Sequence, residues 1–208
     1  MVQPLAYLKE TASQTAGPYV HIGLIPAMAG FDIFENNFSN ILAGPKTKGE
    51  RIILEGRVID GGGVPLRDVL LEIWQANAAG RYNHPADTSS GELDPDFRGW
   101  GRAGSDFDSG LITFETIKPG AIIDKAGRAS APHINVWIVA RGINIGLNTR
   151  IYFADEAAAN AADPVLNLID DPVRRQSLIA ARSERAGRTV YSFTIHLQGD
   201  NETVFFDV

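Results

Sequence analysis

The sequence contains no cysteine. A disulfide framework and a thiolate metal site are therefore both excluded, and a metal could be held only by His, Tyr, Asp, Glu or water. The same absence fits a reducing compartment, so the cytoplasm is the predicted location. The N-terminus lacks a cationic start followed by an apolar run, and no apolar stretch is long enough to span a bilayer, so neither export nor membrane insertion is predicted.

Positive charge is also scarce. The 208 residues include 19 Lys and Arg against 25 Asp and Glu, a net charge of -6, and the basic residues form no cluster. Nucleic acids and anionic membrane surfaces are bound through dense positive charge, so neither partner is predicted. What the chain does have is 44% apolar residues, enough for a single packed domain over residues 1–208.

Short runs rich in β-branched and aromatic residues dominate the sequence. Near the end, Tyr191, Phe193, Ile195 and Leu197 alternate with polar residues, the two-residue period of a strand with one buried face. Similar runs separated by Gly, Pro, Asp and Asn predict further strands at 52–59, 69–75, 111–117, 134–140 and 147–153. The expected fold is mainly β, an antiparallel β-sandwich with short peripheral helices.

Other segments depart from this pattern. Gly61–Pro65 predicts a tight hairpin between the first two strands, because only glycine enters positive φ cheaply. Residues 32–42 and 164–182 are predicted helices, the second with Asp171 as N-cap before a proline. The polar stretch 77–108 is predicted to be a long loop at a binding site or an interface.

His133 and Asn135 are two residues apart at a predicted strand, so their side chains leave one face together. Two histidines placed this way would chelate a transition metal, but an asparagine amide is a weak ligand. Taken alone, His133 is best interpreted as a buried histidine with a hydrogen-bond partner. The three tryptophans are interpreted as core or interface residues; they are Trp74, Trp100 and Trp137.

Several longer motifs have the order and spacing of a known family. They are LLEIWQANAAGRY at 70–82, DPDFRGWGR at 94–102, TIKPG at 116–120 and PHIN at 132–135. Together they resemble the intradiol ring-cleaving dioxygenases over most of the chain. The resemblance implies the β-sandwich of that family, in which two tyrosines and two histidines hold an Fe(III) ion.

Matched residue by residue, the resemblance implies that half of the iron ligands are missing. The two tyrosine positions fall on Tyr82 and Ile122, and the two histidine positions fall on His133 and Asn135. Phenolate and imidazole can hold Fe(III), whereas isoleucine has no lone pair to offer. The chain is therefore predicted to hold no metal and to carry no catalytic residue of its own. His84 is the only substitute donor that the motif offers.

Loss of ligands occurs within this family, in two-chain enzymes whose beta chain keeps the complete set. Three more segments resemble the iron-free chain: SQTAGPYVHIG at 13–23, ARGINI at 140–145 and ETVFFD at 202–207. The resemblance implies an α–β protomer within a larger oligomer, with Fe(III) held by the partner beta chain. It further implies that the assembled enzyme cleaves 3,4-dihydroxybenzoate with O2 to 3-carboxy-cis,cis-muconate.

In such an enzyme the iron-free chain supplies part of the substrate pocket. The residues that the resemblance implies are Thr15, Gly17, Pro18, Tyr19 and Arg141. A guanidinium suits this pocket because the substrate bears a carboxylate. The N-terminal arm, residues 1–48, is implied to make subunit contacts.

Two other functions remain open from the sequence. One is a self-sufficient enzyme with a different metal site around Tyr82, His84 and His133. The other is a non-catalytic β-sandwich that serves as a scaffold or as a binding module, since a fold alone does not determine a function. Iron analysis of the isolated chain would distinguish the first, and co-purification with a homologous ligand-complete chain would argue against the second.

Overall fold

The computed structural model describes residues 14–32, 39–123 and 127–207. Eight strands form one hydrogen-bonded sheet, in the order β3-β2-β7-β8-β9-β10-β1-β4. Their bounds are β1 Arg51–Ile59, β2 Leu70–Gln75, β3 Trp100–Gly104, β4 Ile112–Ile117, β7 His133–Val139, β8 Leu147–Phe153, β9 Ile179–Arg185 and β10 Arg188–His196. A separate two-stranded piece pairs β5 (Ile122–Ile123) with β6 (Ala129–Ser130).

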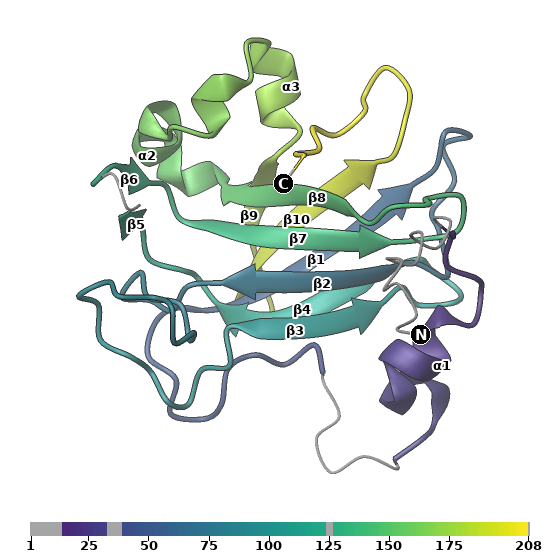
Figure 1. Cartoon of the computed structure of the whole chain (residues 1–208), viewed down its shortest axis with the longest axis horizontal. Coiled ribbons are helices and arrows are strands. Elements are labelled where there is room, and N and C mark those ends of the chain that lie inside the picture. Colours follow the sequence, from purple (N-terminus) through teal and green to yellow (C-terminus); the bar gives the residue numbers. More distant parts are fainter. Residues whose placement is uncertain (1–13, 33–38, 124–126, 208) are drawn as a thin grey trace, which may run out of the picture.

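The large sheet folds over on itself, with β10, β1 and β4 crossing behind β8, β7, β2 and β3 (Figure 1). The main core fills the space between these halves, and it includes Leu71 and Ile138 from the front and Leu54 and Phe114 from the back, all fully buried. The edge strands β3 and β4 also touch, which brings the sheet close to closure. The predicted mainly β fold with short helices is confirmed.

The strictly antiparallel arrangement predicted from the sequence is wrong. β1 pairs with β10 in parallel, and β8 pairs with β9 in parallel. Parallel neighbours need a crossover connection rather than a hairpin. The connection from β8 to β9 is the segment that carries most of the short helices, which Figure 1 shows above β8.

The helical segments are short. They are α1 (Val20–Leu24), α2 (Ala157–Ala162), α3 (Pro172–Gln176), and the 3-10 turns η1 (Pro26–Ala29), η2 (Ala154–Glu156) and η3 (Leu166–Leu168). Asp171 caps α3 as predicted, accepting a 2.8 Å bond from the Val173 N–H. The predicted continuous helix 164–182 is wrong, because η3 and α3 are separate short turns within this range and β9 begins at Ile179. No described helix is long and apolar enough to cross a membrane.

The predicted helix 32–42 lies partly outside the described residues, at 33–38. Its described ends are not helical, and Ile41 instead bridges to Glu115 of β4. The turn at Gly61–Pro65 forms, with Asp60 N–H donating to the Val64 carbonyl at 3.0 Å, but it does not join paired strands because β1 and β2 are not neighbours. The predicted loop 77–108 is mostly irregular, yet it contains β3.

A smaller buried cluster beside the helices is organised by the Asp163 carboxylate, which is fully buried. One carboxylate oxygen accepts from the Tyr152 hydroxyl at 3.1 Å and from the backbone N–H groups of Val165 and Leu166, both at 2.9 Å. The other accepts from the Ala131 N–H at 2.8 Å. This one side chain therefore ties β8, η3 and the start of β7 together.

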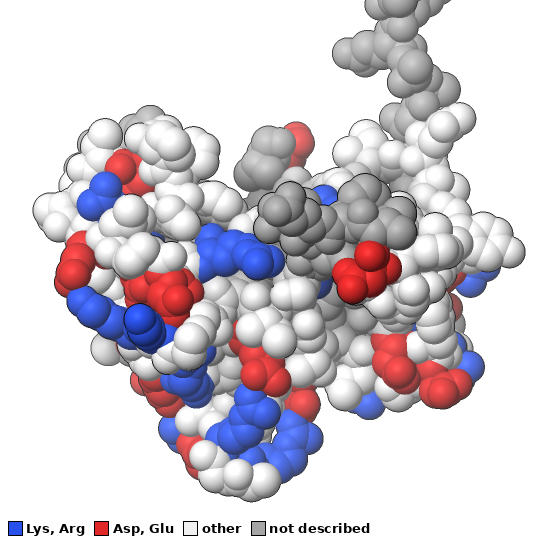
Figure 2. Space-filling view, turned by 90° about the horizontal axis from the view of Figure 1, so that it is seen from below, with Lys and Arg blue, Asp and Glu red and all other residues white. Residues whose placement is uncertain are grey.

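On the surface, the face seen in Figure 2 carries acidic and basic side chains close to one another. Arg182 with Glu184 at 2.7 Å and Arg188 with Glu115 at 3.0 Å are examples of such pairs in the described chain. Exposed pairs of this kind contribute little stability, so the fold depends on the buried clusters.

Candidate functional site

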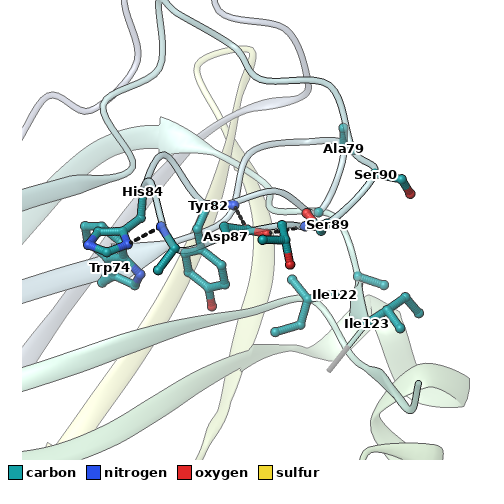
Figure 3. A pocket seen from close by; sticks show the side chains of 14 residues that line it. Trp74, Ala79, Tyr82, His84, Asp87, Ser89, Ser90, Ile122 and Ile123 are labelled. Carbon is teal, nitrogen blue, oxygen red and sulfur yellow. Dashed lines mark hydrogen bonds between the residues drawn. The ribbon is translucent and has the colours of Figure 1, made fainter. Parts of the chain in front are cut away.

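The four residues predicted to occupy iron-ligand positions lie close together. His133 and Asn135 leave the same face at the start of β7, as predicted. The Asn135 side-chain N–H donates to the Tyr82 hydroxyl at 3.1 Å and to the Trp74 carbonyl at 3.2 Å. Ile122 and Tyr82 line the same cavity (Figure 3). We call these four residues the ligand cluster.

Two glycines allow the chain to place Tyr82 beside Ile122. Gly80 has φ +75°, and a Cβ there would lie 2.0 Å from the Ala121 carbonyl oxygen. A Cβ on Gly120 would lie 2.4 Å from the Ala78 carbonyl oxygen. The loops before Tyr82 and before Ile122 therefore cross with their backbones in contact, which only glycine permits.

The cavity beside the ligand cluster has a volume of about 890 Å³, and Tyr82 and Ile122 are the members of the cluster that line it. Trp74 forms part of its wall and stacks on Tyr82 with the ring centroids 5.8 Å apart and the planes 9° apart. Asp87 accepts the Tyr82 backbone N–H at 2.7 Å and holds the loop in place (Figure 3). Trp74 and Tyr82 therefore form an aromatic wall of a cavity that is broadly open to solvent.

The titratable groups of the ligand cluster are uncharged at neutral pH. Burial raises the pKa of the Tyr82 phenol, and the Asn135 hydrogen bond and the Arg150 charge oppose this only in part. Burial, together with the Arg150 charge, lowers the pKa of His133 to about 4. His133 Nδ1 lies 2.8 Å from the Ala131 carbonyl, which can only accept, so Nδ1 carries the proton. Nε2 is buried and has no hydrogen-bond partner among the described residues.

These residues do not fit a ferric ion. Ile122 has no donor atom, and the Asn135 side-chain N–H is committed to hydrogen bonds. His84 is no ready substitute, because its Nδ1 accepts the Ala86 N–H at 3.1 Å. Nowhere in the described part of the chain do three His, Cys, Asp or Glu side chains approach closely enough to hold a metal.

The predicted substrate-pocket residues gather elsewhere. The Thr15 hydroxyl donates to the Ala140 carbonyl at 3.2 Å and accepts the Gly142 N–H at 2.7 Å, so it brackets Arg141 on both sides. The Arg141 side chain is 60% exposed and its Nε lies 2.5 Å from the buried carboxylate of Asp68. This contact is an ion pair, since neither Asp68 oxygen accepts a hydrogen bond from a described residue.

The next part of the N-terminal arm is exposed beside this contact. Gly17, Pro18 and Tyr19 all face solvent, and the Tyr19 side chain is 73% exposed. The structure therefore brings Thr15 to Arg141 and leaves the other three predicted residues free to meet another molecule. It assigns none of the five a substrate contact within this chain.

The ligand cluster and the Thr15–Arg141 group lie at opposite ends of β7. His133 is the first residue of β7, and Arg141 follows shortly after its end at Val139. Eight residues of extended chain span roughly 26 Å. The exposed Arg141 group therefore cannot act on a ligand held at this chain's own ligand cluster.

Three residues near the ligand cluster were not predicted from the sequence. They are Arg150, Tyr152 and Asp163. Arg150 acts on the pKa values of Tyr82, His133 and Tyr152, and Tyr152 lies against His133 with ring centroids 5.7 Å apart. Asn148, Arg150 and Tyr152 alternate along a predicted strand, which was a signal for one polar face. The tryptophans are half-buried and lie outside the main core, so a core role for them is wrong.

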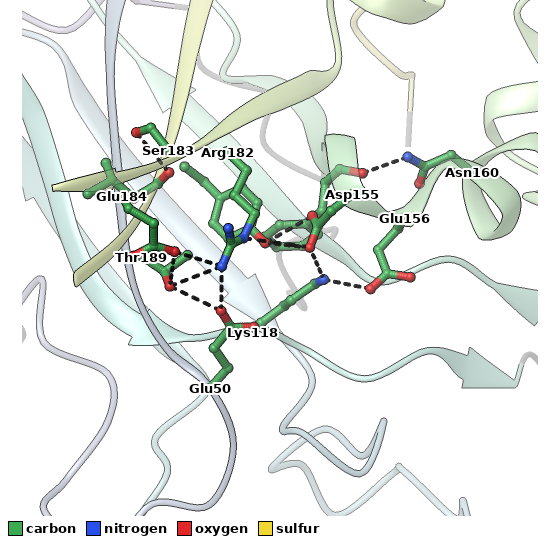
Figure 4. Close-up of polar contacts among 12 residues, drawn as sticks. Glu50, Lys118, Asp155, Glu156, Asn160, Arg182, Ser183, Glu184 and Thr189 are labelled. Carbon is green, nitrogen blue, oxygen red and sulfur yellow. Dashed lines mark hydrogen bonds and ion pairs between the residues drawn. The ribbon is translucent and has the colours of Figure 1, made fainter. Parts of the chain in front are cut away.

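Lys118, which belongs to the TIKPG motif, serves a structural network (Figure 4). Its Nζ lies 2.7 Å from Asp155 and 2.6 Å from Glu156, and the Tyr191 hydroxyl donates to Asp155 at 2.9 Å. Burial tends to raise the pKa of Asp155, but the hydrogen bonds from Lys118 and Tyr191 outweigh it and hold that pKa below its usual value.

Asp155→Asn is expected to lower the free energy of unfolding at pH 7 and to lower it less at acid pH. Because the folded pKa of Asp155 is depressed, its contribution is fully present above the unfolded value, near 3.8, and is lost as the pH falls through the lower folded value. Urea denaturation of wild type and variant near pH 7 and near pH 2.5 would measure this. An equal difference in unfolding free energy at both pH values would contradict the assignment.

Comparison with known proteins gives a consistent result. The family model described as Dioxygenase matches residues 33–199. The chain is 51% identical to the protocatechuate 3,4-dioxygenase alpha chain of Pseudomonas putida, over 98% of this chain and 99% of that one. It is 45% identical to the alpha chain of Burkholderia cepacia over 97% and 98%. The beta chain of Burkholderia cepacia is 38% identical over 74% of this chain and 67% of that one.

Solved structures share the fold at lower identity. The intradiol ring-cleavage dioxygenase of Tetranychus urticae has a TM-score of 0.58 at 17% identity, covering 80% of this chain and 89% of that one. The 3-chlorocatechol 1,2-dioxygenase of Rhodococcus opacus has a TM-score of 0.55 at 23% identity, covering 92% and 69%. These two likenesses concern the fold alone.

Proposed function

The chain belongs to the intradiol dioxygenase family, and we propose that it is the iron-free alpha subunit of a protocatechuate 3,4-dioxygenase. One observation carries the proposal: the chain is similar to alpha chains over 98% of its length, and its ligand cluster contains Ile122 and Asn135 in place of two donors. In this proposal it pairs with a homologous beta chain in an α–β protomer of a larger oligomer.

The reaction would take place in the assembled enzyme. Fe(III) would be held by the beta chain, and 3,4-dihydroxybenzoate would react with O2 to give 3-carboxy-cis,cis-muconate, with both oxygen atoms entering the product. This chain would contribute pocket wall through Thr15, Gly17, Pro18, Tyr19 and Arg141. Two observations support that role: Thr15 and Arg141 are held together, and the exposed arm residues lie next to them.

The cytoplasm remains the proposed compartment. The arm, residues 1–48, would make subunit contacts, and two contacts in its described part support this role. Arg102 donates to the Leu24 carbonyl at 3.0 Å, and the His21 ring lies edge-on to Phe107 at 4.9 Å. These contacts fix the root of the arm on its own chain while exposing Tyr19 to a neighbour.

Arg141→Ala is expected to raise the KM of the assembled enzyme for 3,4-dihydroxybenzoate by about tenfold, because one charge-assisted contact to a carboxylate is lost. Iron content should stay unchanged, since Arg141 does not coordinate the iron in this proposal. Steady-state kinetics and iron analysis of the co-expressed enzyme would measure both. Arg188→Ala, which removes an exposed arginine elsewhere, is the control. Unchanged kinetics in Arg141→Ala would remove it from the pocket.

The proposed function is tested by producing the chain with and without a ligand-complete homologous partner. The chain alone should carry no iron and cleave no ring, and the co-produced pair should do both. Tyr82→Phe and His133→Ala should leave the iron content of the pair unchanged, because neither side chain binds metal in this proposal. A coloured, active chain on its own would indicate a self-sufficient enzyme. Failure to associate with any such partner would favour the scaffold or binding module.

A further inference from the structure

The outer face of β2, β7 and β8 carries two polar and aromatic rows. The strand registers place Trp74, Asn135 and Arg150 side by side in one row, and Glu72, Trp137 and Asn148 in the next. The residues between them along the strands, such as Ile73 and Val136, point into the main core. Neighbours across strands have Cβ atoms about 5 Å apart, so each row is a continuous surface.

A second cavity, of about 550 Å³, lies over these rows. Trp74, Trp100 and Trp137 form its aromatic walls, and Val165, Leu168 and Phe206 close it from the helical side and the C-terminal segment. Small-molecule sites are typically concave, mostly apolar and within this range of volume. Three half-buried tryptophans in one wall present flat surfaces suited to an aromatic ring.

Arg150 brings positive charge into this cavity and has no acidic partner there. Glu72 is engaged by Arg102, whose Nε lies 2.5 Å from its carboxylate. Asp207 is exposed at the rim, and no carboxylate of the described chain lies within ion-pair distance of Arg150. Its one hydrogen bond among the described residues is a long contact of 3.5 Å to the Tyr152 hydroxyl.

The other groups that face Arg150 do not compensate its charge. Asn135 and Asn148 are neutral amides, and a phenol or an imidazole carries no negative charge near neutral pH. Asp163 makes no direct ion pair with Arg150 and is linked to it through the Tyr152 hydroxyl, which donates to Asp163 at 3.1 Å. A half-buried guanidinium left in this state is stabilised by an anion, and a carboxylate matches its two parallel N–H groups.

We propose that this cavity is a binding site for a small aromatic carboxylate, with the carboxylate on Arg150 and the ring against the tryptophans. This inference goes beyond the proposed function, because the site lies on this chain and takes part in no ring cleavage.

Equilibrium dialysis with radiolabelled benzoate on the assembled two-chain enzyme tests the proposal. Wild type should bind one benzoate per copy of this chain in addition to any bound at the ferric centre. Arg150→Gln should weaken the extra site by at least about tenfold, while Arg188→Gln, with the same charge change, should leave it intact. Acetate, which has no ring, should compete only weakly. Equal benzoate binding by wild type and Arg150→Gln would overturn the proposal.

Two further measurements cover the other outcomes. Trp100→Leu removes an aromatic wall from the edge strand β3 without changing charge, so it should also weaken benzoate binding even if Arg150→Gln folds poorly. If wild type binds no extra benzoate and Arg150→Gln fails to assemble with its partner, the carboxylate on Arg150 comes from the partner chain, and a small-molecule site is refuted. Iron content and ring cleavage report separately on the proposed function and do not depend on the benzoate count.

Discussion

Asp163→Ala is expected to lower the free energy of unfolding by about 3–5 kcal/mol, because four hydrogen-bond donors lose their acceptor inside the protein. Each unpaired buried donor costs about 1–3 kcal/mol, and water entering the space left by the carboxylate offsets part of the sum. Tyr152 is fully buried, so its hydroxyl has few other partners to turn to. The start of β7 should loosen too, since the Ala131 N–H is one of the four donors.

Urea denaturation of the purified protein, followed by far-UV circular dichroism, would measure this change as a lower midpoint at constant slope. Asp170→Ala removes an exposed carboxylate from the same connecting segment, and its free energy of unfolding should stay within about 0.5 kcal/mol of wild type. A loss below 1 kcal/mol for Asp163→Ala would mean that the four donors find other partners, and that Asp163 does not organise the cluster.

Restoring the two missing donors, with Ile122→Tyr and Asn135→His together, is expected to leave the chain nearly free of iron. The strand register places position 135 directly across from Arg150. A ferric ion bound by two phenolates keeps one net positive charge, and two unit charges about 5 Å apart repel by about 3 kcal/mol at an effective dielectric near 20. That repulsion weakens binding roughly a hundredfold.

Adding Arg150→Gln to the Ile122→Tyr, Asn135→His variant is expected to raise its iron content to one ion per chain, with the visible absorption of tyrosinate bound to Fe(III). Arg150→Lys in the same background is the matched control, because it keeps the charge and should keep the chain poor in iron. Metal analysis and the visible spectrum would measure both variants. Full iron occupancy in the Ile122→Tyr, Asn135→His variant with Arg150 intact would show that the two missing donors alone prevent iron binding.

The strands that the sequence predicts best are those with clear apolar periodicity. The ranges 52–59 and 147–153 agree with β1 and β8 to within one residue. β9 was missed because IAARSER has almost no apolar alternation and most of its residues are exposed. Its place between β8 and β10 is decided by pairing with residues far away in the chain, which local propensity does not report.

The sequence predicted only those residues of the candidate site that lie in its motifs or directly beside them. Tyr82, His133 and Asn135 belong to motifs, Ile122 follows the TIKPG motif by two residues, and the four do lie together. Arg150 belongs to none of the quoted segments. Its position opposite Asn135 depends on the register between β7 and β8, and a shift of one residue would turn it to the core. The positive charge beside this cluster was therefore not predictable before the pairing of β7 and β8 was known.

The position of β7 has a consequence for how this chain can change over time. One tip of the strand borders the ligand cluster, and the other is followed by the exposed Arg141. Because the interior face between them is packed and the tips share no side chain, substitutions can accumulate at one tip without disturbing the other. A chain built this way can lose or gain a binding role at one end of β7 while the other end stays as it is.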